Sequence, residues 1–108
     1  MPYSVEYFNR DVLAAIEDWP VDLLAAYVRV MELLMELGPH IGMPHSRALG
    51  GGLFELRFRA RDTTGRAAYC YRSGGRIIVL HAFVKKTRRT PPAELRVARR
   101  RLREVRDD

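Results

Sequence analysis

The chain has 108 residues, of which 47% are hydrophobic and 30% charged, and this size suits one domain, spanning residues 1–108, with a core of its own. Its single cysteine, Cys70, excludes an internal disulfide and a metal site built on several cysteines. No apolar run approaches the ~18 residues of a membrane span, and no secretion signal is visible at the N-terminus. We therefore expect a cytoplasmic protein without a membrane partner.

The formal net charge of +6 is unevenly distributed along the sequence. Residues 1–37 contain two arginines and seven acidic residues, whereas residues 38–108 contain seventeen lysines and arginines and six acidic residues. A basic region of this kind attracts polyanions, most often nucleic acids, although a solvated surface without a partner has the same composition. The charge pattern favours a polyanion partner.

Side-chain periodicity predicts the elements of the first third of the chain. Residues 3–8 alternate apolar and polar side chains, which predicts a short strand. Residues 10–18 have helical spacing, and a second helix is expected over residues 21–37, between Pro20 and a Gly-Pro pair. This second helix is apolar around more than one stripe, so part of its surface could face a partner instead of the core.

A loop rich in glycine and proline is expected over residues 38–52. Three antiparallel strands are predicted after it, and the third, the most apolar, is expected to be central; they cover residues 53–60, 66–72 and 76–85. Gly65 lies in the first hairpin turn and is available for a positive φ.

A helix with many arginines is predicted from Pro91 or Pro92 to residue 108. The order β-α-α-β-β-β-α predicts an α+β fold. An antiparallel meander would pack against an N-terminal helical hairpin and the C-terminal helix.

Metal chemistry has little support in the sequence. The three histidines, His40, His45 and His81, share no ligand spacing with one another or with Cys70. We therefore expect no metal and no cofactor, and we interpret Cys70 as a small core residue.

Cations are placed where the three meander strands would meet at one edge of the sheet. Arg59 ends the first strand, Arg66 begins the second, and Lys85 and Lys86 end the third. If these side chains converge, they could hold a phosphate and stabilise charge that develops on it, although a row of solvated charges is the simpler alternative.

Three residues are candidates for proton transfer. They are Glu55, on the cationic face of its strand, His45, in the loop before the sheet, and His81, in the apolar strand. Each also has a structural interpretation: a salt bridge for Glu55, an exposed position for His45 and core packing for His81.

The segments "LFELRFRARDTTGRAAYCY" (53–71) and "IIVLHAFVKKTRRTPPAEL" (77–95) resemble the RelE/HigB-like toxins of type II toxin–antitoxin systems, in particular their phage-derived branch. The similarity covers nearly the whole chain. It rests on three pieces in a fixed order: Gly52 to Arg57, Arg66 to Tyr69, and Lys85 to Pro91.

The resemblance implies a RelE-like fold and an endoribonuclease that cuts messenger RNA on the ribosome without a metal or cofactor. By the same resemblance, Arg66 would hold the scissile phosphate, and Lys86 with Lys85 would stabilise the transition state or protonate the leaving oxygen. Basic positions of the family correspond to Arg57 and Arg47. Further candidate RNA contacts are Arg59, Arg88 and Arg89.

The sequence departs from the best-known toxins at two places that concern RNA cleavage. Leu53 and Glu55 stand where those toxins have lysines, and no aromatic residue occurs after residue 86. The general base therefore stays open among Glu55, His45 and His81.

The resemblance also implies a partner, a small antitoxin with a helix-turn-helix domain. The alternatives are a basic RNA- or ribosome-binding module without catalysis and a protein-interaction subunit.

Overall fold

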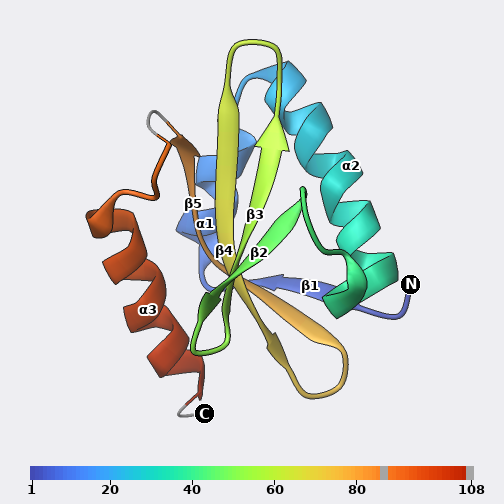
Figure 1. Ribbon diagram of the computed structural model, residues 1–108, viewed down its shortest axis with the longest axis vertical. Helices are drawn as coiled ribbons and strands as arrows, with labels where there is room; N and C mark the ends of the chain where they lie inside the picture. The colour runs from blue at the N-terminus through green and yellow to red at the C-terminus, as the bar shows by residue number, and fades with distance from the viewer. Residues whose placement is uncertain (86–87, 107–108) are drawn as a thin grey trace.

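The computed structural model describes residues 1–85 and 88–106. Three α-helices, one short 3₁₀-helix and five strands make up this part of the chain (Figure 1). In chain order they are β1 (Ser4–Tyr7), α1 (Arg10–Glu17), α2 (Val21–Leu37), η1 (Gly38–His40), β2 (Ser46–Gly50), β3 (Leu53–Arg59), β4 (Thr64–Arg72), β5 (Arg76–Lys85) and α3 (Pro92–Arg106).

The five strands form one mixed sheet in the order β1-β5-β4-β3-β2. Strands β2 to β5 pair antiparallel, as a meander, while β1 pairs parallel with β5, with Val5 opposite Ile77. Helices α1 and α2 pack on one face of the sheet and α3 on the other, so α2 and α3 flank the sheet in Figure 1.

Local signals explain the helix boundaries. The side chain of Asn9 caps α1 by accepting a hydrogen bond from the Val12 backbone N–H at 3.0 Å. Helix α2 follows Pro20 and ends at Gly38, which has a φ of 52°. A side chain at Gly38 would also collide with the ring of Tyr3, so both the backbone and the packing require glycine there.

The larger core lies between the sheet and the first two helices. Its buried residues include Ile16, Leu23 and Leu34 from the helices, packed against Phe58 and Tyr69 from the sheet. Most of the apolar surface of α2 is used here, but Val21 and Val28 remain exposed. The periodicity of α2 therefore indicated mainly core packing.

The smaller core lies under α3. Ala98 and Leu102 pack against the sheet face that carries Leu53, Cys70 and Leu80. Arginines fasten the same helix to backbone carbonyls: Arg99 donates to Leu49 and Gly50, Arg101 to Leu80 at 2.8 Å, and Arg106 to Gly51. The helix predicted after Pro91 or Pro92 is confirmed, and several of its arginines are structural.

The α+β class is confirmed, but the structure differs from the expectation in the order of elements, in the middle strand of the sheet and in the role of Gly65. The segment expected to be a loop contains the strand β2, which adds a fifth strand beside β3. The middle strand of the five is β4, while β5, the strand expected to be central, is an inner strand between β1 and β4. Gly65 lies within β4 and its φ is not positive; it is glycine because Trp19 packs against its α-carbon.

Among the helices of the residues described, none combines the length and apolar content needed to cross a lipid bilayer.

Candidate functional site

The meander brings cations together at the end of the sheet where β3 ends, β4 begins and β5 ends. Arg57 lies directly opposite Arg66, and in the next row Arg59 and Lys85 flank Thr64 from either side. Neighbouring strands are about 4.8 Å apart, so Arg59 and Lys85 start about 10 Å from each other. Arg47 on β2 joins the group, because it pairs with Glu55 on β3.

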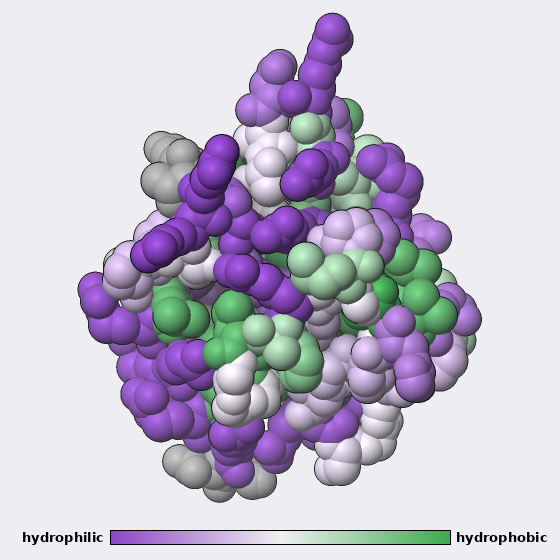
Figure 2. Space-filling model, viewed as in Figure 1, coloured by the Kyte–Doolittle hydropathy of each residue, from purple (hydrophilic) through white to green (hydrophobic). Residues whose placement is uncertain are grey.

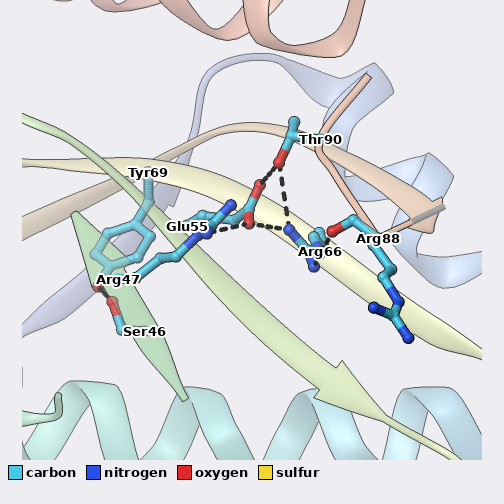
Figure 3. A network of polar contacts seen from close by, with 7 residues as sticks. All are labelled: Ser46, Arg47, Glu55, Arg66, Tyr69, Arg88 and Thr90. Atoms are coloured by element: carbon cyan, nitrogen blue, oxygen red, sulfur yellow. Dashed lines mark hydrogen bonds and ion pairs between the residues drawn. The ribbon is translucent and has the colours of Figure 1, made fainter. Parts of the chain in front are cut away.

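Glu55 lies at the centre of these cations and is almost completely buried, with 1% of its surface exposed. Its carboxylate accepts a hydrogen bond from the Arg66 guanidinium and another from the Thr90 hydroxyl at 2.6 Å (Figure 3). The Nε of Arg47 lies 3.6 Å from the same carboxylate. Glu55 is therefore held by three partners and has no free face toward solvent.

Arg66 is fully buried, at 0% exposure, by the segment that leads into α3. Its guanidinium also donates to the Thr90 hydroxyl at 3.3 Å and to the backbone carbonyl of Arg88 at 3.4 Å (Figure 3). Burial lowers the pKa of Arg66, while the charge of Glu55 opposes this effect. Arginine stays charged in proteins, so Arg66 is a buried cation covered by residues 88–90.

The accessible cations surround this buried pair. Arg59 is exposed, Arg57 and Lys85 are partly exposed, and the Arg47 side chain is 39% exposed. Partial desolvation lowers the pKa of Lys85, and the nearby charges of Arg66 and Arg57 lower it further. Figure 2 shows hydrophilic side chains gathered over this part of the face, above β3, β4 and the segment before α3.

The two histidine candidates lie in different surroundings. His81 packs under α3, where its Nε2 lies 3.2 Å from the Glu94 carboxylate. Burial lowers the pKa of His81, against the effect of Glu94. His45 instead lines a cavity of about 500 Å³ between α2 and the edge of β3, together with Arg57 and Arg59. His45 therefore shares a cavity with cations of the cluster.

The remaining candidates are less informative. Arg88 and Arg89 are exposed on the segment before α3. Lys86 lies outside the described residues. Cys70 is buried under α3, and burial raises the pKa of its thiol, with Arg72 and Arg106 opposing that change. In residues 1–85 and 88–106, no three or more His, Cys, Asp or Glu side chains are grouped so as to hold a metal ion.

Two parts of this arrangement were not identified from the sequence. Thr90 caps the buried ion pair, and Arg29 on α2 lines the cavity beside β3. Neither has a local sequence signal, because each meets its partners only when distant elements pack together. The alternation of charged residues in β3 was the useful signal, since it placed Glu55 and Arg57 on one face.

Most of the chain matches the model of a known protein family. The model of the family described as "Phage derived protein Gp49-like (DUF891)" matches residues 14–103. That range contains β2 to β5, the cation cluster and most of α3. No curated protein matches this chain. Because the family model covers far more than half of the sequence, the chain belongs to the Gp49-like family of phage-derived proteins.

Proposed function

We propose that this protein is the toxin of a toxin–antitoxin pair and acts as a metal-independent endoribonuclease on messenger RNA at the ribosome. The Gp49-like family is often related to toxin–antitoxin systems, which supports the first part. The single observation that carries the second part is the group of four cations, Arg47, Arg57, Arg66 and Lys85, around one buried carboxylate.

In the proposed reaction the ribose 2′-oxygen attacks the adjacent phosphorus while the bond from phosphorus to the 5′-oxygen breaks. The products are a 2′,3′-cyclic phosphate and a 5′-hydroxyl. The 2′-hydroxyl must lose a proton, the leaving oxygen must gain one, and negative charge accumulates on the phosphate oxygens between these events. A cluster of preorganised cations lowers the barrier at that stage.

The geometry refines the roles that the resemblance implied. Arg57 and Lys85 are the cations that contact the phosphate in this proposal, because both reach solvent. Arg66 stabilises charge from beneath them, since residues 88–90 cover it. Lys85 donates the proton to the leaving oxygen, a role that its lowered pKa favours at neutral pH.

The general base in this proposal is His45. Glu55 is committed to three partners, and His81 is paired with Glu94 of α3. His45 lines the same cavity as Arg57 and is partly exposed. A neutral imidazole has a ring nitrogen that can accept the proton.

The experiment is induced expression in a bacterial host, with growth curves and primer extension on a reporter messenger RNA. Wild type is compared with Arg57→Ala, Lys85→Ala and His45→Ala, and Arg10→Ala on the acidic first helix is the matched control. We expect growth arrest and cuts within translated codons for wild type and the control. The three site variants should lose cleavage by about 10²-fold or more, as removal of one charge-stabilising or acid–base group does.

A second function, RNA or ribosome binding without catalysis, is favoured by the same group of cations, which outnumber the single carboxylate of Glu55. It predicts arrest without cleavage, and a graded loss of ribosome affinity in Arg57→Ala and Lys85→Ala that becomes smaller at high salt. Absence of arrest from folded wild-type protein would reject both functions.

A further inference from the structure

The cavity beside β3 has a lining suited to one class of ligand. Part of its lining is apolar, from Ala26, Val30 and Leu33 of α2 and from Pro44, and the rest is basic (Figure 1 shows α2 running beside the end of β3). The basic residues are Arg29, Arg57, Arg59 and His45. No acidic side chain lines it among the residues described, so the cavity favours an anionic ligand with a flat apolar part.

The size of the cavity is consistent with a nucleotide. Its volume of about 500 Å³ lies within the range of sites that enclose small ligands, about 300–1,000 Å³. A nucleobase presents apolar faces, which stack on proline, aliphatic and guanidinium groups, and its phosphate carries the charge. An acidic peptide would also satisfy the arginines, and it is the alternative occupant that a comparison of peptide with RNA distinguishes.

Arg57 connects this cavity to the cation cluster. It lines the cavity and also lies opposite Arg66, within electrostatic reach of Lys85. The Nε of Arg57 is buried and makes no hydrogen bond to any residue in the described part of the chain; the same holds for Arg47 and Arg66, but of the three only Arg57 lines the cavity. Buried donors in folded proteins nearly always have an acceptor, so a donor left open at this position points to a ligand atom.

We propose that this cavity is a nucleobase subsite, which holds the base next to the phosphate bound by Arg57. The proposal rests on the proposed function for the direction of the RNA but adds a separate site on α2. Arg29 and Arg59 hold the flanking phosphate, and the wall formed by Val30, Leu33 and Pro44 receives the base. Cleavage should then depend on the base at one position beside the cut.

The test uses the full chain and 2′-O-methyl RNA trinucleotides, which cannot be cleaved through the 2′-oxygen. One trinucleotide carries three bases and a second lacks the middle base. Binding is measured by the shifts of the Val30 and Leu33 methyl signals in NMR spectra, with the Val28 methyls on the exposed side of the same helix as an internal control. We expect the Val30 and Leu33 signals to shift, and affinity to fall about tenfold when the middle base is absent.

Two variants test separately how the apolar wall and the basic residues of the cavity contribute to binding. Val30→Trp fills the cavity and should lower affinity about tenfold for the complete trinucleotide, while it leaves the abasic one unchanged. Val28→Trp is its matched control. Arg29→Glu reverses an exposed charge of the cavity lining without a change in the core and should weaken both ligands, with Arg10→Glu as its control. Thermal melts confirm that each variant is folded.

The outcomes discriminate between this inference and the proposed function. Equal binding of both trinucleotides, or wild-type affinity in Val30→Trp, would overturn the subsite even if the protein cleaves RNA. Methyl shifts caused by an acidic peptide and not by RNA would make the cavity a protein-docking site and would also overturn it. Base-dependent binding without cleavage in cells would support the subsite and reject the endonuclease.

Discussion

Glu55 and Arg66 lie diagonally across β3 and β4, with 1% and 0% of their surfaces exposed, and form an ion pair inside the fold. Charged groups in such a position are costly to bury and are tolerated only when their hydrogen bonds are satisfied. Thr90 and the Arg88 carbonyl bond to the pair, which leaves the Arg66 Nε as its one buried donor without a partner among the described residues. The pair therefore depends on the segment before α3.

Removal of one member of the Glu55–Arg66 pair should lower the free energy of unfolding more than removal of both. Glu55→Ala or Arg66→Ala leaves an uncompensated buried charge and should lower the free energy of unfolding by about 3–5 kcal/mol. The double variant Glu55→Met/Arg66→Leu should regain most of that loss. Urea unfolding followed by circular dichroism measures both effects. Single variants within about 1 kcal/mol of wild type would show that the pair is not buried in solution.

Thr90 should contribute to stability through its hydroxyl. Thr90→Val keeps the shape of the side chain but removes the bond to Glu55 at 2.6 Å, and it should cost about 1.5–3 kcal/mol because the acceptor is charged. Thr90→Ser retains the hydroxyl and is the matched control, expected to stay close to wild type. Equal stability of the valine and serine variants would exclude this role. The measurement is again the free energy of unfolding in urea.

His81 should make the protein less stable in weak acid. Burial lowers the pKa of His81 in the folded chain, although Glu94 raises it, and Arg101 adds to the lowering. Between the folded pKa and the ordinary value of 6.5 the unfolded chain binds more protons, so stability falls as pH falls through this window. The melting temperature of wild type should therefore drop from pH 7 to pH 5 more than that of His81→Gln. Parallel pH profiles for the two proteins would contradict the assignment.

Gly65 should not tolerate a side chain. A Cβ at this position would lie 2.8 Å from the indole of Trp19 and 3.3 Å from Leu23 Cδ2. Gly65→Ala should cost about 1–3 kcal/mol through overpacking. Trp19→Phe removes the atoms that collide, so the two substitutions together should cost less than the sum of the separate losses. Strict additivity in urea unfolding would show that the clash is relieved by other means.

The helices and the meander could be predicted because their signals are local. Proline, glycine and the spacing of apolar residues mark the ends of α2 and α3, and alternation marks β3. Strand β2 was missed because it is short and largely exposed between glycine-rich segments. Its extended form depends on pairing with β3, which a single segment cannot reveal.

The convergence of cations followed from the expected register, but the burial of Arg66 did not. Its cover comes from Thr90 and Arg88, more than twenty positions further along the chain. The alternation of β3 placed Glu55 beside arginines, yet it could not indicate that this carboxylate would be enclosed. The distinction between a phosphate-binding arginine and a covered one required the three-dimensional arrangement.

The parallel pairing of β1 with β5 has a consequence for synthesis. Ser4 pairs with Arg76, so β1 cannot join the sheet until more than two thirds of the chain has been synthesised. Lys85 and Thr90 follow later still. A growing chain therefore lacks both the finished sheet and the assembled cation cluster until translation is nearly over. Nascent fragments of this protein do not carry its site.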